Sequence, residues 1–258
     1  MTTDGAQRTA GAGGEPNVQY LELLPHEFRA RLAARPVGYL PLGTLEWHGE
    51  QNALGADALQ SQALFTRAAR RFGGIVFPPL FLGPDRVRLQ DDGRALIGMD
   101  SADVTRPPRR LDGSCYWISK GLFLQLVEGV LAQAKRAGFR VVVADGHGPS
   151  RWAFREHAPG WETQFGLHLI SPGHRIEGEW RSQVDHAGKN ETSLMLAHYP
   201  ALVDLGQLPA DRSVWPQGVA GEDPRDATAE HGEACIAASL ALIEAALEQS
   251  GAALPTPG

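Results

Sequence analysis

Along the chain, short continuous apolar runs alternate with longer stretches in which apolar residues have helical spacing. Runs of this kind are typical of strands buried on both faces, as in parallel sheets with crossover helices. Strands are expected at 37–43, 74–83, 140–146 and 165–171, and helices at 26–35, 56–73, 120–139, 189–200 and 226–251. The sequence therefore predicts an α/β fold with a mostly parallel central sheet.

The length of 258 residues and a hydrophobic content of 43% suit a single large domain, expected at 18–250. Residues 1–17 are rich in Gly, Thr and Ala, so we expect a disordered N-terminal arm, and 251–258 should be a flexible tail. The stretch 84–116 has no sustained period. Such a long irregular segment in a compact domain is usually functional or oligomeric.

Composition narrows the classes of function. The formal net charge of -6 offers no basic footprint for nucleic acid, which favours a small-molecule substrate. Cys115 and Cys235 are the two cysteines and lack CxxC spacing, so neither a disulfide framework nor a thiolate zinc site is expected. No apolar run approaches the roughly 18 residues of a membrane span. We expect a cytoplasmic protein without a membrane partner.

Ionisable residues gather where the first predicted strand ends, in "GTLEWHGEQNALGAD". Glu46 and His48 are two residues apart, so in extended chain their side chains point the same way, and Asp57 follows across a loop. Carboxylates with imidazole form the ligand set that zinc, manganese and iron(II) prefer. The alternative is a solvated loop in which Asp57 caps the next helix.

Two further segments carry similar groups. In "ADGHGPSR", His147 lies between two glycines directly after a predicted strand, either as a ligand or as a structural hydrogen-bonding group. In "DHAGKNETS", His186 and Glu191 precede an apolar helix, and this pattern also fits an ordinary helix start. Because ligands collect at the carboxyl ends of strands in open α/β sheets, these segments are expected to meet there.

Taken together, the three segments resemble the creatininase superfamily of metal-dependent amidohydrolases. The family motifs read approximately LPxGSxExHGxHLPxxTD, NGHGGN and HAGxxETS, and here they stand in the same order as "LPLGTLEWHGEQNALGAD", "ADGHGPS" and "DHAGKNETS". The segment "LDGSCYWIS" corresponds to the family's GTxSL-like stretch, and the resemblance runs from about residue 20 to about 205. It implies a three-layer α/β/α creatininase-like fold.

The resemblance also implies a site with two divalent ions per subunit, zinc, manganese or iron. The implied metal ligands are Glu46, His48, Asp57, His147 and Glu191. Asp57 would bridge the ions, and Glu191 would replace a glutamate that creatininase has where this chain has Pro149. His186 is expected to orient the substrate or carry a proton, and Glu191 counts with it among the catalytic residues.

The departures from the family motifs concern the substrate. Polar residues take the place of the family's HLP and asparagines, and the side chains expected to bind substrate are Glu50, Gln51, Asn52, Tyr116 and Ser150. Such groups suit a polyhydroxylated ring, and the variants look similar to a branch whose 3-dehydro-scyllo-inosose hydrolase opens a keto-inositol by cleaving a carbon–carbon bond. The alternatives are a cyclic amidohydrolase or peptide-processing amidase, and a non-catalytic sugar-binding protein. The family resemblance also implies a homo-oligomer, a hexamer.

Overall fold

In the computed structural model, which describes residues 15–177 and 185–250, the centre of the chain is a five-stranded sheet. The strand order is β2-β1-β5-β6-β7, and neighbouring strands run parallel. The strands are β1 (Val37–Leu42), β2 (Ile75–Val76), β5 (Val141–Gly146), β6 (His168–Pro172) and β7 (Arg175–Ile176). The expected parallel sheet is confirmed.

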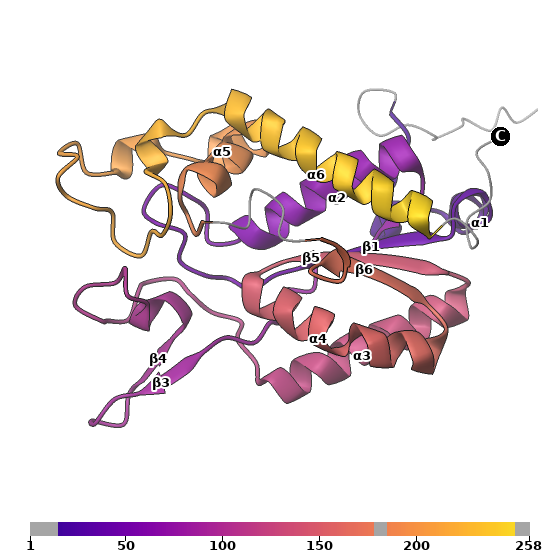
Figure 1. Ribbon diagram of the computed structural model, residues 1–258, viewed down its shortest axis with the longest axis horizontal. Helices are drawn as coiled ribbons and strands as arrows, with labels where there is room; N and C mark the ends of the chain where they lie inside the picture. Colours follow the sequence, from indigo (N-terminus) through magenta and orange to yellow (C-terminus); the bar gives the residue numbers. More distant parts are fainter. Residues whose placement is uncertain (1–14, 178–184, 251–258) are drawn as a thin grey trace, which may run out of the picture.

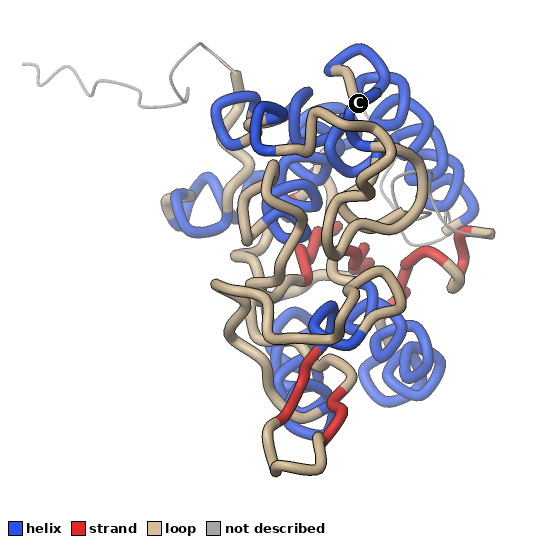
Figure 2. The backbone as a smooth tube through the Cα atoms, turned by 90° about the vertical axis from the view of Figure 1, so that its left-hand side faces the viewer, coloured by secondary structure: helices blue, strands red, loops and turns tan. Residues whose placement is uncertain are grey.

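Helices cover both faces of this sheet, which gives the three layers visible in Figure 1. One face carries α2 (Ala56–Phe72), α5 (Lys189–His198) and α6 (Ala229–Gln249), and the other carries α3 (Lys120–Ala137) and α4 (Gly148–Phe165). The short helix α1 (Pro25–Ala34) contacts β2 at one edge of the sheet. The tube in Figure 2 shows the strands enclosed between the two groups of helices.

The pleat of the two central strands divides the core into two clusters. Along β5, Val141 and Val143 face the cluster under α2 and α6, whereas Val142 and Ala144 face the cluster under α3 and α4. All of these side chains are buried. Side chains alternate across a strand, so a run that is apolar at every position is buried on both faces, as the sequence predicted.

The irregular stretch 84–116 forms an arm on the outside of the layers. It contains the antiparallel hairpin of β3 (Val87–Leu89) and β4 (Ala95–Ile97), followed by the 3-10 helix η2 (Gly98–Ser101). The hairpin extends away from the sheet at the lower left of Figure 1 and the bottom of Figure 2. The other 3-10 helices among the described residues are η1 (Tyr20–Glu22), η4 (Pro200–Leu202), η5 (Leu205–Gln207) and η6 (Pro224–Asp226).

Strand β2 and helix α4 differ from the sequence expectations, and the short strands β3, β4 and β7 were not predicted. The run 74–83 contributes only the two residues of β2 because its prolines cannot donate ladder hydrogen bonds. Helix α4 was not predicted, since Pro149, Pro159 and Gly160 all argue against a helix. Pro149 lies in the first turn, where its missing N–H costs nothing.

The predicted arm and tail lie mostly outside the described part of the chain. The tail 251–258 and all but 15–17 of the arm fall outside the described residues. Val18 is buried, and its carbonyl accepts a hydrogen bond of 2.8 Å from Val76. Within the described ranges, no helix is both long and apolar enough to cross a membrane.

Candidate metal centre

The two central strands bring the first two motifs together. Leu42, at the end of β1, is paired with Gly146, at the end of β5, so the loops that follow leave the sheet side by side. Gly146 has a φ of 145°, and a Cβ there would overlap the carbonyl of Leu42. Only glycine fits this close approach. The chain then turns, and the N–H of His147 donates to the Leu42 carbonyl at 3.0 Å.

The imidazole of His48 is held with one nitrogen facing two carboxylates. Nδ1 donates to the backbone carbonyl of Glu46 at 3.0 Å, because a carbonyl only accepts. Nε2 lies 3.5 Å from Asp57 Oδ1 and 3.8 Å from Glu191 Oε2, and it is buried with no hydrogen-bond partner among the described residues. A histidine fixed through its far nitrogen, with the other aimed at carboxylates, has the arrangement of a metal ligand.

His147 repeats this arrangement on the other side of Asp57. Its Nε2 donates to the carbonyl of Pro84 at 3.2 Å. Its Nδ1 lies 3.1 Å from Asp57 Oδ2 and 3.2 Å from Glu46 Oε2. Asp57 therefore presents one oxygen to each imidazole, which is the geometry of a carboxylate able to bridge two ions.

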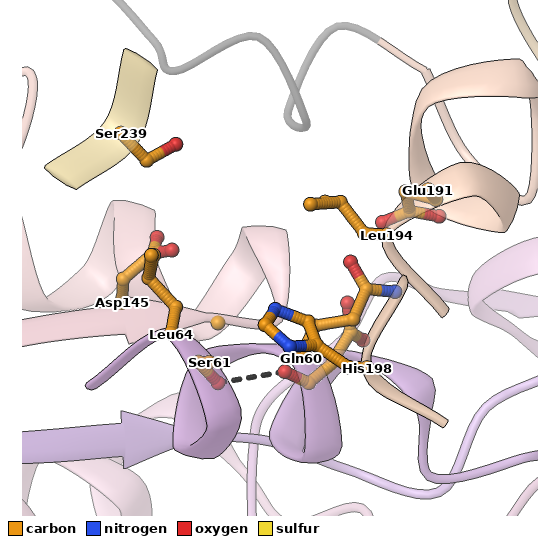
Figure 3. Close-up of a pocket in the computed structure, with 10 residues that line it drawn as sticks. Gln60, Ser61, Leu64, Asp145, Glu191, Leu194, His198 and Ser239 are labelled. Carbon is orange, nitrogen blue, oxygen red and sulfur yellow. Dashed lines mark hydrogen bonds between the residues drawn. The ribbon is translucent and has the colours of Figure 1, made fainter. Parts of the chain in front are cut away.

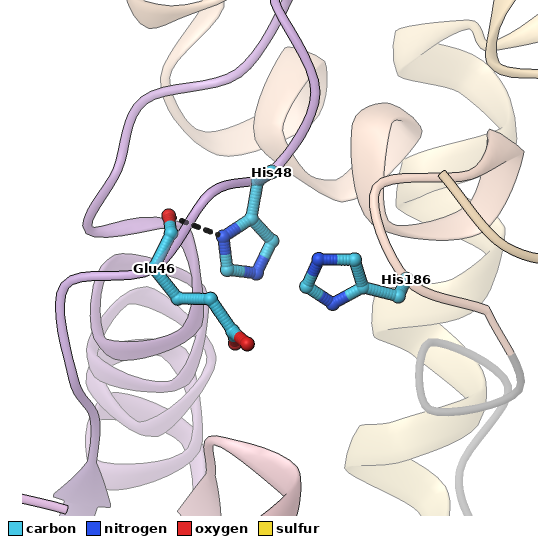
Figure 4. A group of neighbouring side chains, drawn as sticks. All are labelled: Glu46, His48 and His186. Atoms are coloured by element: carbon cyan, nitrogen blue, oxygen red, sulfur yellow. Dashed lines mark hydrogen bonds between the residues drawn. The ribbon is translucent and has the colours of Figure 1, made fainter. Parts of the chain in front are cut away.

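Within 15–177 and 185–250, three overlapping groups of side chains have ligand atoms within 4.8 Å of one another. They are His48, Asp57 and Glu191; Glu46, Asp85 and His147; and Glu46, His48 and His186. Figure 4 shows the third group, in which His48 and His186 face each other above the carboxylate of Glu46. Buried carboxylates with imidazoles suit zinc, manganese or iron(II), so the residues fit the predicted ions.

The electrostatics of the cluster indicate a site built for positive charge. Burial alone would lower the pKa of His48, but Asp57, Glu191 and Glu46 outweigh it and raise that pKa to about 10. The pKa of His147 is raised in the same way by Glu46 and Asp57 against burial. Protonated histidines thus neutralise the buried carboxylates, a role that divalent cations fill better.

The third motif folds into the start of α5. Asp185 accepts the N–H groups of Asn190 at 2.7 Å and Glu191 at 3.2 Å, so Asp185 caps the helix. Glu191 folds back to accept the N–H of Ala187 at 2.6 Å with the same oxygen that faces His48. The segment is therefore a helix start, and the same start positions the Glu191 carboxylate at the cluster.

His186 stands beside the cluster in a defined orientation. Its Nε2 donates to the carbonyl of Trp47 at 2.8 Å, which leaves Nδ1 as the nitrogen able to accept a proton. Its ring lies 4.5 Å from that of His48 (Figure 4). Burial, and then the neighbouring His48, lower the pKa of His186, so its ring is neutral near pH 7.

The cluster opens into a cavity of about 460 Å³ between the strand ends and the outer arm. Beyond the clustered side chains, its walls include Arg86, Met99, Asp103, Val104, Arg151, Trp152 and Asp185. A cavity of this size fits a small-molecule substrate.

None of the five side chains predicted to bind substrate lines this cavity. Gln51 donates from Nε2 to the Ala187 carbonyl at 2.8 Å, and Asn52 donates to Thr192 Oγ1 at 3.0 Å. These amides support the α5 segment, because the loop folds against it. Ser150 is fully buried, whereas Glu50 and Tyr116 are exposed to solvent elsewhere.

Sequence reasoning missed Asp85 and did not use Arg151. Asp85 belongs to a ligand-like group, and the buried Arg151, which lines the cavity, lies 3.5 Å from Asp145. The only sequence signal for Asp85 was its place in the irregular stretch 84–116.

A second, smaller cavity of about 20 Å³ borders the cluster (Figure 3). It is bounded by Asp57 and Glu191 of the cluster and by Gln60 and His198. The Nε2 atoms of Gln60 and His198 are buried without a hydrogen-bond partner in the described ranges. The space holds about one water molecule, which would satisfy such atoms.

His198 makes the free energy of unfolding depend on pH. Burial and then Arg67 lower its pKa to about 4, from 6.5 in an unfolded chain. Between pH 6.5 and 4 the unfolded chain takes up a proton that the folded chain refuses, so acid lowers the free energy of unfolding, by at most about 3 kcal/mol.

We expect His198→Gln to reduce this acid sensitivity, measured by urea unfolding at pH 7.5 and pH 4.5. His26→Gln, at an exposed position, is the matched control and should behave as wild type. Equal pH dependence in wild type and His198→Gln would contradict the assignment.

A parallel α/β sheet with buried carboxylates and imidazoles at its strand ends defines a metal-dependent hydrolase. The chain matches the family model described as creatininase, creatinine amidohydrolase, over residues 22–247. It is 31% identical to the creatinine amidohydrolase of Pseudomonas putida over 207 residues, covering 72% of this chain and 74% of that protein. The chain belongs to the creatininase family, as its motifs predicted.

Solved structures agree with this fold. A crystal structure of creatininase has a TM-score of 0.68 at 24% identity, covering 90% of this chain and 97% of the other. A mutant creatininase of Zn-Zn type has a TM-score of 0.64 at 24% identity, covering 92% and 99%. At this identity the likeness concerns the fold, and the three-layer architecture is confirmed.

Proposed function

We propose that this protein is a two-metal hydrolase that opens a cyclic amide. One ion is assigned to Glu46, Asp57 and His147, and the other to His48, Asp57 and Glu191. The observation that carries the proposal is Asp57, whose two oxygens each face one imidazole. Structures of creatininase in Mn and Zn-Zn forms support the same class of ion here.

Each group of the site then has a distinct task. When bound, two divalent ions at such a site lower the pKa of a coordinated water toward neutrality and polarise the carbonyl under attack. His186 is proposed to take a proton at Nδ1 and return it to the leaving nitrogen, since its Nε2 is held by Trp47. The outcome is ring opening with the former ring nitrogen as the leaving group.

Glu191→Gln tests the second metal site. The amide oxygen of glutamine still accepts the Ala187 N–H, so the helix start is kept while the charge facing His48 is lost. We expect metal content measured by elemental analysis to fall from two ions per chain to one.

Glu222→Gln is the matched control, because Glu222 is exposed and pairs with Lys189. This control should keep two ions. Two ions in Glu191→Gln would remove Glu191 from the ligands.

The substrate is proposed to be a small cyclic amide, with creatinine as the first compound to try. The relatives are creatinine amidohydrolases, and one creatininase structure is complexed with creatine, which supports this class. The polar side chains that favoured a polyhydroxylated ring in the sequence do not line the cavity.

Carbon–carbon cleavage of a keto-inositol is the second candidate. Two carboxylates outside the ligand-like groups, those of Asp103 and Asp185, line the cavity and can accept hydroxyl hydrogen bonds. Such acceptors discriminate hydroxylated rings from plain ones. They support this candidate less strongly than the relatives support an amide.

A substrate panel separates the two candidates. Metal-loaded protein is incubated with creatinine, other cyclic amides and keto-inositols, and products are identified by mass spectrometry. Uptake of one water with a new amine or amidine terminus supports the amidohydrolase, and an acyclic keto acid from a keto-inositol supports the second candidate. No turnover of any compound in the presence of two bound ions would favour a non-catalytic binding protein.

We also propose a cytoplasmic homo-oligomer, a hexamer by family resemblance. The proposal is supported by the small number of cysteines and by the family to which the chain belongs. Light scattering on the purified protein measures the oligomeric mass directly.

A further inference from the structure

Asp85 is a buried carboxylate next to the cluster to which the motifs assign no role. It lies between Gly83 and the hairpin strand β3, and its side chain is only 3% exposed. Oδ1 accepts the backbone N–H of Arg86 at 2.6 Å. Oδ2 is buried beside the Glu46 carboxylate, and no N–H or alcohol hydroxyl group in the described part of the chain donates to it. An unpaired buried carboxylate oxygen is costly unless a ligand satisfies it.

Two glycines let this carboxylate approach the cluster. A Cβ on Gly98 would lie 2.4 Å from Asp85 Oδ2 and 3.0 Å from Glu46 Oε1, so Gly98 sits against both carboxylates. A Cβ on Gly83 would lie 2.6 Å from the carbonyl of Gly43. The outer arm therefore packs onto the end of β1 so closely that only glycine fits at these two points.

The close approach places like charges together. Ligand atoms of Glu46, Asp85 and His147 lie within 4.8 Å of one another. Two buried carboxylates repel each other unless a cation or a proton lies between them. Asp85 is not needed to orient His147. His147 Nε2 lies 3.2 Å from the Pro84 carbonyl and 3.6 Å from Asp85 Oδ2, so the carbonyl is the closer acceptor.

We propose that Asp85 is an additional ligand of the ion assigned to Glu46 and His147, an inference that rests on the proposed function. This site would then have three carboxylates, from Glu46, Asp57 and Asp85, with one imidazole. Oxygen ligands favour harder ions, so the added carboxylate should make the usual advantage of zinc over manganese smaller at this site than at the site of His48 and Glu191. The irregular arm thereby completes the metal centre.

The test is a titration of metal-stripped protein with Mn²⁺, in which free Mn²⁺ is followed by electron paramagnetic resonance. Wild type should bind two ions per chain. In Asp85→Asn, one ion should bind at least about 10- to 100-fold more weakly. The asparagine oxygen keeps the hydrogen bond from Arg86, and circular dichroism checks that the variant is folded.

Asp103→Asn is the matched control. It removes the same charge from the wall of the same cavity, but Asp103 is exposed and belongs to none of the three ligand-like groups. We expect its Mn²⁺ affinity to equal that of wild type. An equal loss in both variants would mean that only the charge of the cavity matters and would overturn the inference.

A crystal structure of the Mn²⁺-loaded protein tests the ligand directly. Asp85 should approach the ion to about 2.0–2.3 Å. Unchanged Mn²⁺ affinity in a folded Asp85→Asn, or an ion more than about 3 Å from Asp85, would overturn the inference and leave the proposed function intact. Failure of wild type to bind Mn²⁺ or Zn²⁺ would instead overturn both.

Discussion

Asp57→Asn should abolish the binding of both ions and lower kcat/KM by at least about 10³-fold. The reason is that Asp57 presents one carboxylate oxygen to each imidazole, with Oδ1 3.5 Å from His48 and Oδ2 3.1 Å from His147. Loss of the ions removes several kcal/mol of transition-state stabilisation, and each 1.4 kcal/mol corresponds to about tenfold in rate. Elemental analysis and steady-state kinetics on the first substrate found in the panel measure the two effects.

Asp91→Asn is the control for this substitution, since Asp91 is exposed in the turn between β3 and β4. It should retain two ions and wild-type kinetics. An Asp57→Asn protein that keeps one tightly bound ion would show that the two sites are independent. Asp57 would then not be a bridge.

The second large effect is expected for His186→Gln, which should keep both ions but lower kcat by about 10²- to 10⁴-fold. The glutamine amide can still donate to the Trp47 carbonyl, but it has no nitrogen able to take up a proton as Nδ1 does. KM should change little, because the role assigned to His186 is proton transfer. Elemental analysis and separate determination of kcat and KM test this.

The control for His186 is His157→Gln, at a position on α4 that does not line the cavity. It should retain wild-type kcat. If His186→Gln lost metal in proportion to activity, the residue would be a ligand, in keeping with its place beside Glu46 and His48. If the variant kept full kcat, a different group would carry the proton.

The sheet was predictable because a strand that is buried on both faces has apolar residues at consecutive positions. Val141 to Val143 are apolar without alternation, and the structure places them alternately in the two core clusters. Helix α4 was not predictable in the same way. The effect of a proline on a helix depends on its position in the helix, which the sequence does not give. Pro149 is tolerated because it lies in the first turn.

The candidate site was only partly readable from the sequence. Glu46, His48, Asp57 and His147 follow strand ends that the sequence predicts, and the register of β1 with β5 brings them together. Asp85 reaches the same point through the outer arm, a packing contact that no local pattern encodes.

Gln51 and Asn52 show the opposite case. Their polarity led to the prediction that they bind substrate, but the type of a residue in a loop does not determine the direction of its side chain. The structure places both amides in hydrogen bonds to the segment around α5.

Whether this chain is a two-metal hydrolase is best decided by measuring the number of bound ions per chain and the turnover in the same titration. Protein stripped with a chelator is titrated with Mn²⁺ or Zn²⁺, and bound ions and substrate turnover are measured at each step. We expect saturation at two ions per chain, with turnover absent from the stripped protein and complete only when the second ion binds. Saturation below two ions, or full turnover in the stripped protein, would contradict it.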